Sequence, residues 1–235
     1  MHPNRVFHWT DEQEMLAFVA QVSFATICVD GPAVVHAPLV LAGRDRLLFH
    51  VSRSNPAAAK LENARAIASV MGPDFYVSPD WYGTPDQVPT WNYLVVEAEG
   101  PLRPLDEVEL AALLDRLSAD HEERLTPKMP WTRGKMTPGR FEAMLKAIIG
   151  YELTIEALRG TRKLGQNKKA EERESVADAL AALGRDDHAA LMQPSPAGGR
   201  GLGEGNGLSA GSKPVQPACT SRPHPSPLSR AGEGA

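Results

Sequence analysis

The sequence predicts a mainly β protein with flanking helices, an α+β fold built around a small antiparallel barrel. Short apolar, β-prone runs follow one another closely, and tight-turn residues such as Asp30-Gly31 and Gly43-Arg44-Asp45 separate them. This spacing favours hairpins over parallel strand–helix–strand units. No glycine-rich phosphate loop follows any of these runs, which excludes the dinucleotide-binding and P-loop folds.

The pattern of apolar residues, turn residues and helix caps places the individual elements. The expected strands cover residues 24–29, 33–41, 47–51, 66–71, 75–77, 93–96 and 150–158. The expected helices cover residues 11–20, 56–63 and 168–183, and two more begin near Asp106 and near Thr137-Pro138. Capping boxes are expected from Thr10 with Gln13 and from Asp106 with Glu109.

Composition indicates a cytoplasmic protein with one folded domain. No apolar run approaches the roughly 20 residues that span a bilayer, and the N-terminus has no apolar signal segment. With only Cys28 and Cys219, neither a disulfide framework nor a four-cysteine zinc site is available. We expect a folded domain over residues 1–183 and a tail over residues 184–235 that is disordered, because from Pro194 onward it is rich in Gly, Pro and Ser.

The charge distribution gives little support to DNA binding. The net charge is −4, and residues 194–235 carry +2 of their own, so residues 1–193 carry −6. An acidic body with a weakly basic tail does not have the concentrated positive charge that is typical of nucleic-acid-binding proteins. No basic recognition helix of the helix-turn-helix kind is visible either.

Aromatic residues concentrate in residues 75–96, although aromatic residues make up only 6% of the chain. This stretch contains Trp81, Trp91 and three of the four tyrosines, in a loop between two β-prone runs. Such a loop can stack on a flat ring and bond its edges. The alternative is a loop whose aromatic side chains simply fill one end of the barrel.

A second candidate site follows the strand at residues 47–51. Asn55 is a suitable N-cap and Pro56 a suitable first residue for a short helix, whose free N–H groups favour an anion. Arg53 and Lys60 place positive charge near that helix start, and arginine presents a planar fork to phosphate oxygens. The alternative is a solvated surface with two ordinary cations.

Several motifs, in order, resemble a known family. They are VVHAPLVL, HVSRSNP, GPDFYVSPDWY, VPTWNY and IIGYELTIEALRGTRKLGQN. Together they are similar to the PaiB-like family of FMN-binding negative transcriptional regulators, within the flavin-binding split-barrel superfamily. The resemblance covers about residues 1–183.

The resemblance implies a six-stranded antiparallel split barrel that binds FMN, as a homodimer with the flavin between subunits. By position it implies that Arg53 and Lys60 bind the FMN phosphate, with Ser52, Ser54 and Asn55 as neutral donors. It implies that Trp81, Trp91 and Asn92 lie near the isoalloxazine, some of them from the partner subunit. It also places Lys163, Gln166 and Asn167 at the cofactor groove, although Asn167 alternatively reads as the N-cap of the last helix.

The sequence is compatible with three functions. The first is an FMN-binding negative transcriptional regulator, and the second is an FMN-dependent oxidoreductase. The third is a haem-binding protein on the same barrel, since His36 and His50 lie on neighbouring expected strands. A strand histidine more often packs and hydrogen-bonds, so we expect no metal site. No catalytic triad or catalytic carboxylate pair can be placed, and no catalytic residue is assigned.

Overall fold

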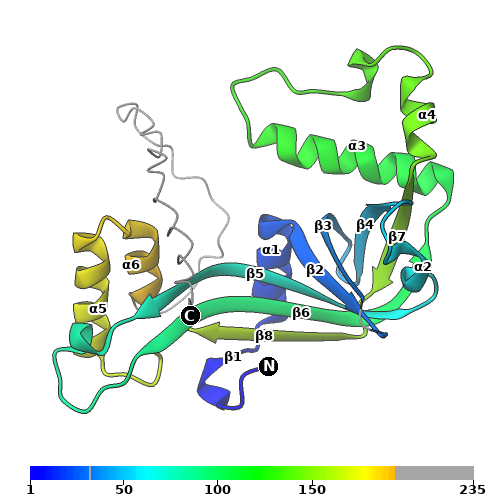
Figure 1. Ribbon diagram of the computed structural model, residues 1–235. Helices are drawn as coiled ribbons and strands as arrows, with labels where there is room; N and C mark the ends of the chain where they lie inside the picture. The colour runs from blue at the N-terminus through cyan, green and yellow to red at the C-terminus, as the bar shows by residue number, and fades with distance from the viewer. Residues whose placement is uncertain (32, 194–235) are drawn as a thin grey trace, which may run out of the picture. The chain divides into compact units, whose positions relative to one another are not determined.

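The structure is a computed structural model that describes residues 1–31 and 33–193 (Figure 1). Its strands are β1 (His8–Trp9), β2 (Phe24–Val29), β3 (Ala33–Ala42), β4 (Arg46–Ser52), β5 (Arg65–Val77), β6 (Thr90–Pro104), β7 (Ile148–Thr154) and β8 (Ala157–Lys163). Its α-helices are α1 (Glu12–Val22), α2 (Ala58–Leu61), α3 (Glu107–Glu123), α4 (Arg140–Leu145), α5 (Ala170–Ala182) and α6 (Asp186–Met192). Short 3-10 helices are η1 (Arg5–Phe7), η2 (Pro79–Tyr82) and η3 (Arg133–Lys135). In this described part, no helix has both the length and the apolar character needed to cross a membrane.

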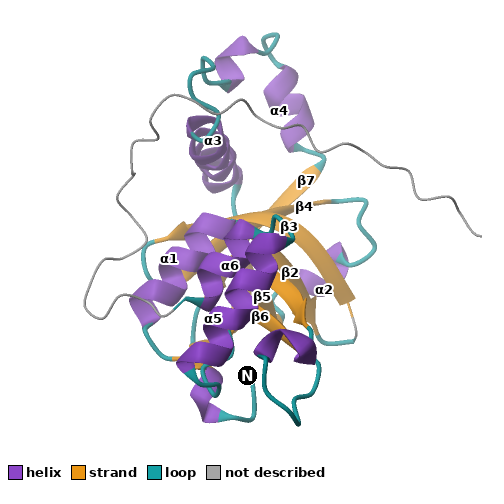
Figure 2. Cartoon of the chain, turned by 90° about the vertical axis from the view of Figure 1, so that its left-hand side faces the viewer, coloured by secondary structure: helices purple, strands orange, loops and turns teal. Residues whose placement is uncertain are grey.

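Six of the strands close into a ring. They pair in the order β6–β5–β2–β3–β4–β7, all antiparallel, and β7 pairs again with β6. Strand β6 permits this closure because residues 93–99 pair with β8 whereas residues 102–104 pair with β7. The predicted six-stranded antiparallel barrel with flanking helices is therefore confirmed (Figure 2).

Gly100 lies where β6 changes partner. A Cβ atom at this position would overlap the backbone oxygen of Thr154, at the end of β7. The close approach of the two backbones therefore requires glycine.

Strand β5 joins two runs that were predicted separately. Its pairing with β6 is interrupted between Met71 and Asp74, where Gly72 and Pro73 form an irregularity. A Cβ atom on Gly72 would come within 2.7 Å of the Phe18 ring, so helix α1 packs directly on this point. Beyond it, β5 and β6 continue together away from the ring (Figure 1).

Helix α1 begins one residue later than its predicted capping box. Asp11 is the N-cap, and its carboxylate accepts a hydrogen bond from the Glu14 N–H at 2.9 Å. The expected box of Thr10 and Gln13 is wrong because the adjacent carboxylate, an equally good cap, takes this role.

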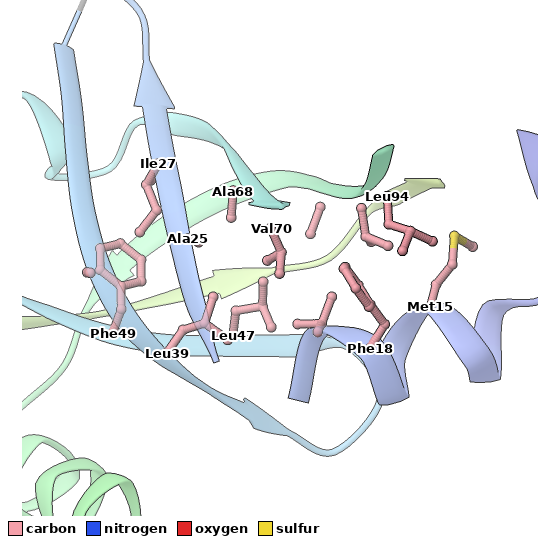
Figure 3. Packing of buried hydrophobic residues seen from close by; sticks show 14 of the residues in the cluster. Met15, Phe18, Ala25, Ile27, Leu39, Leu47, Phe49, Ala68, Val70 and Leu94 are labelled. Atoms are coloured by element: carbon pink, nitrogen blue, oxygen red, sulfur yellow. The ribbon is translucent and has the colours of Figure 1, made fainter. Parts of the chain in front are cut away.

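The main hydrophobic core fills the inside of the ring, and all six of its strands contribute side chains to it. Alternate residues of its strands point inward, and α1 adds Met15 and Phe18 at one end (Figure 3). The inward side chains labelled there are Ala25, Ile27, Leu39, Leu47, Phe49, Ala68, Val70 and Leu94, none more than 5% exposed.

A second, smaller core lies on the outside of the barrel, beneath helices α3 and α4. Val40 of β3 packs there with Leu110, Leu113 and Leu145. The predicted capping box of Asp106 and Glu109 is confirmed at the start of α3, with both of its hydrogen bonds present.

The C-terminal part departs from prediction in two ways. The single strand expected over residues 150–158 is two strands, β7 and β8, which a turn at Ile155 and Glu156 separates without glycine or proline. Helix α6 buries Ala189 and Met192, so the folded domain continues to about residue 193 and the boundary at 183 is too early. The disordered tail expected from Pro194 lies outside the described residues.

Candidate functional site

Two exposed aromatic side chains lie on the outer surface where β5 ends and β6 begins. Tyr76 and Trp91 are directly opposite each other, with ring centroids 6.2 Å apart in an edge-to-face arrangement. They are 44% and 51% exposed. The Trp91 indole N–H donates to Asp74 Oδ1 at 2.8 Å, which fixes the plane of the indole. The pair offers a surface on which a flat ring can stack.

Lys163 lies beside this aromatic pair, at the end of β8. It is opposite Tyr93 of β6, and its ammonium donates to the Thr90 hydroxyl and to the Trp91 carbonyl oxygen. Partial burial lowers the pKa of this ammonium. The structure thus brings together two of the residues selected from the sequence, Trp91 and Lys163, and adds Tyr76 and Asp74.

Asn92 and Trp81 do not reach this surface. Asn92 follows Trp91 in a strand, so its side chain points to the opposite face. It is 1% exposed, and its amide nitrogen donates to Met192 Sδ of α6 at 3.2 Å. Trp81 is half-buried in η2 and packs against the main core. The two-residue period of a strand is the sequence signal that separates Trp91 from Asn92.

Gln166 closes the turn that follows β8. Its amide nitrogen donates to the Arg162 carbonyl at 2.6 Å, and its amide oxygen accepts from the Leu164 N–H at 2.8 Å. These bonds support the turn interpretation for this side chain. The alternative role of Asn167, as the N-cap of the last helix, is wrong, because the N-cap of α5 is Lys169.

A buried carboxylate that the sequence analysis missed ties the aromatic loop to α5. Glu172 accepts hydrogen bonds from the Thr84 hydroxyl at 2.8 Å, from Gln87 Nε2 at 3.1 Å and from the Lys169 N–H at 3.0 Å. The pKa of Glu172 lies below its ordinary value, chiefly because of the hydrogen bond from the Lys169 N–H and also because of the bond from the Thr84 hydroxyl. The loop after η2 is therefore fixed by polar contacts.

The segment from Ser52 to Lys60 forms a second candidate cluster. Asn55 Oδ1 accepts from the Ala57 N–H at 2.9 Å, which shapes the turn before α2. The hydroxyls of Ser52 and Ser54 are 2.8 Å apart, and both residues are exposed. Helix α2 has only four residues, fewer than expected, so any anion site here depends on side chains more than on a helix dipole.

Arg53 and Lys60 both lie on this segment but contact different neighbours. Arg53 Nε donates to the Lys146 carbonyl at 2.9 Å, whereas the Lys60 ammonium donates to the Gly31 carbonyl. Across residues 1–31 and 33–193, no carboxylate lies within 4.0 Å of either cation. Their charge is therefore available to an incoming anion.

The two clusters lie at opposite ends of β5. Helix α2 comes just before Arg65, at one end, whereas Tyr76 is at the other (Figure 1). Eleven steps of extended chain separate these two residues, about 35 Å at the usual rise per residue. One chain therefore cannot place both clusters on one small ligand.

Comparison with protein families settles what kind of barrel this is. The model of a family described as "Putative FMN-binding domain" matches residues 1–157. The chain belongs to this family. FMN is accordingly the cofactor of this fold, and the resemblance to PaiB-like proteins is confirmed by a curated relative.

That relative is protease synthase and sporulation protein PAI 2 from Bacillus subtilis (strain 168). It is 28% identical over 187 residues, which cover 77% of this chain and 89% of the relative. Among solved structures, the FAD and heme binding protein from Mycobacterium smegmatis is similar with a TM-score of 0.52 and 20% identity, covering 73% of this chain and 79% of that one. A flavocytochrome from Azotobacter vinelandii has a TM-score of 0.51 and 19% identity, covering 70% and 73%. At these identities the two structures support the fold alone.

The side chains of the FMN-binding domain fit the two ends of FMN. Ser52, Arg53 and Lys60 are exposed hydroxyl and cationic donors of the kind that hold a phosphate. The exposed Trp91 indole, with the Tyr76 ring edge-on beside it, offers an aromatic side chain on which an isoalloxazine can stack.

The two histidines considered for haem lie on the outside of the barrel. His36 is exposed, and its Nδ1 is 3.1 Å from the Thr26 hydroxyl. His50 is partly buried, and burial lowers the pKa of its imidazole. Within the described chain, no group of three or more His, Cys, Asp or Glu side chains is arranged to hold a metal ion.

Proposed function

We propose that this protein binds FMN between two copies of the chain and acts as a negative transcriptional regulator. The observation that carries the proposal is the separation of the two clusters. A phosphate site around Arg53 and a ring site around Trp91 are each half of a flavin site. In one chain they lie near opposite ends of β5, which measures about 35 Å along the strand from Arg65 to Tyr76. A second copy supplies the missing half to each.

An exposed apolar area supports the same dimer. Cys28 of β2 is directly opposite Val34 of β3 and Ile67 of β5, and all three are exposed on the outer face of the barrel. Phe24 and Met71, on the same face, are 51% and 56% exposed. The outer face of an antiparallel sheet is usually polar where water covers it. These five exposed apolar side chains lie on either side of a row formed by Thr26, His36 and Ser69, and such a face fits a contact with a second, identical surface.

Each cluster has a distinct part in holding the cofactor. Arg53 and Lys60 would bind the phosphate, and the Ser52 and Ser54 hydroxyls would donate to its oxygens. Trp91 of the other copy would cover the ring face, with Lys163 near the ring edge. When bound, FMN supplies reversible one- and two-electron redox chemistry.

The regulator role rests on the family resemblance, and an oxidoreductase is the second candidate. A flavin carries hydride chemistry with little help from side chains, so NAD(P)H oxidation by the FMN-loaded protein would favour the enzyme. FMN binding without turnover would favour the regulator. An absorption spectrum of the purified protein distinguishes both from a haem protein, which would show a Soret band.

Mixed dimers test the shared site directly. The first variant carries both Arg53→Ala and Lys60→Ala, and the second carries Trp91→Ala alone. Each variant by itself is expected to bind FMN weakly. If two copies share each site, random mixing makes half of the dimers heterodimers with one intact site, so about a quarter of all sites recover wild-type affinity. No recovery in a mixture shown to contain heterodimers would refute the shared site.

A further inference from the structure

The segment between α3 and α4 has an unusual charge. Residues 124–140, the basic loop, contain five cations and no carboxylate. The chain as a whole carries −4, so everything outside the basic loop carries −9. The positive charge of an acidic protein is thus concentrated in one short segment.

The basic loop is exposed to solvent along most of its length. None of its residues is buried, and both views show it at the outer end of the α3–α4 pair, away from the barrel (Figures 1 and 2). Three prolines, Pro127, Pro130 and Pro138, restrict its backbone. A stiff, exposed loop loses little conformational entropy when it binds.

Part of this charge is already neutralised. Lys128 pairs with Glu122, and Arg133 lies 3.2 Å from Asp115, both carboxylates belonging to α3. For the other three cations, Arg124, Lys135 and Arg140, no carboxylate of the described chain lies within 4.0 Å.

Exposed apolar side chains lie among these cations. Leu125 is 53% exposed, Met129 79% and Trp131 39%. Cations that neutralise phosphates, mixed with apolar side chains that can press into a groove, are typical of proteins that contact the DNA backbone and minor groove. A purely solvated loop would not need to expose tryptophan and methionine together.

From these observations we infer that the basic loop is a DNA-contacting surface that grips the phosphate backbone of duplex DNA. The inference rests on the proposed regulator function and gives that function a physical contact. The acidic remainder of the protein repels DNA, so the protein approaches DNA with the basic loop facing it. Arg124 already donates to the Ala20 and Gln21 carbonyl oxygens and to the Ser23 hydroxyl. Lys135 and Arg140 remain, and two cations predict weak binding with little sequence preference and a slope of log affinity against log salt of about −2.

Anisotropy of a labelled 20-base-pair duplex, titrated with the FMN-loaded protein between 50 and 200 mM salt, tests the inference. Lys135→Gln with Arg140→Gln should weaken binding about tenfold at 50 mM salt and reduce the slope by about two. The matched control, Arg5→Gln with Arg44→Gln, removes the same charge from exposed positions elsewhere and should change the affinity less than twofold. Trp131→Ala should also weaken binding, with partial rescue by Trp131→Phe.

Three outcomes would overturn the inference: no binding at 50 mM salt, equal losses in the basic-loop and control variants, or binding to phosphatidylserine vesicles without binding to DNA. The flavin spectrum and FMN affinity are measured on every variant. If the protein binds FMN but does not bind DNA, this inference is refuted and the proposed flavin site is not affected. If the wild-type protein does not bind FMN, that result would instead count against the proposed function.

Discussion

Removing the two cations of the phosphate cluster should separate FMN from riboflavin. The double variant Arg53→Ala with Lys60→Ala leaves the aromatic pair untouched, and only FMN carries a phosphate for the cations to bind. Both side chains are exposed, so the variant is expected to fold. The effect should therefore appear in one ligand and not in the other.

The magnitude follows from the contacts. Two charge-assisted hydrogen bonds at exposed positions contribute about 3 kcal/mol, at the lower end of their range. Each cation must first give up a bond to a backbone carbonyl, Arg53 to Lys146 and Lys60 to Gly31, which together cost about 1 kcal/mol. The net loss of about 2 kcal/mol corresponds to about 30-fold weaker FMN binding.

Flavin fluorescence titrations at 150 mM salt measure both affinities. Riboflavin affinity should change less than threefold. The control variant Arg5→Ala with Arg44→Ala removes the same charge from exposed positions outside both clusters and should change neither ligand. Equal losses of FMN and riboflavin affinity in the test variant would refute the assignment of these cations to the phosphate.

Three further predictions concern stability. Gly100→Ala should lower the unfolding free energy by more than the roughly 1–3 kcal/mol of ordinary overpacking, because the clash is with backbone, whereas Gly134→Ala has space and should be neutral in urea titrations. The hydrogen bonds from Arg103 lower the pKa of Glu109 to about 2 in the fold, so stability is lost as pH falls from about 4.5 towards 2; Glu109→Gln should flatten that part of the acid-denaturation curve. Burial lowers the pKa of His50, so its neutral form is favoured in the fold and stability should fall as pH drops below about 6.5; a pH–stability profile unchanged by His50→Gln would contradict this.

Local signals account for the elements that the sequence predicted well. Strand β2 has its predicted bounds because Asp30-Gly31 ends it sharply, and the capping box of α3 follows from the spacing of Asp106 and Glu109. Each of these depends on a few neighbouring residues. The division of residues 150–158 between β7 and β8 was missed because the turn there has neither glycine nor proline.

The candidate site was harder to predict because it depends on pairings between distant segments. Lys163 meets Trp91 only because β8 pairs with β6, and no local pattern gives that register. The burial of Asn92 depends on α6, which lies within the expected tail. Alternation along β6 does predict that Trp91 and Asn92 face opposite ways, once a strand is accepted there.

The proposed flavin site and the proposed DNA-contacting loop can be coupled through Arg53. The Arg53 side chain bonds the Lys146 carbonyl and its N–H bonds the Ala147 carbonyl, both directly after α4. Helix α4 in turn starts at the end of the basic loop. An FMN phosphate that draws the guanidinium away removes the first contact but leaves the second. Loss of one hydrogen bond of about 1 kcal/mol limits the coupling through this route to about fivefold, and by linkage DNA would change FMN affinity by the same factor. A stronger effect of FMN on DNA binding requires a change in how the two copies pack together. The barrel between the Ser52–Lys60 segment and the Tyr76–Trp91 pair is closed and rigidly packed, so it does not transmit such a change within one chain.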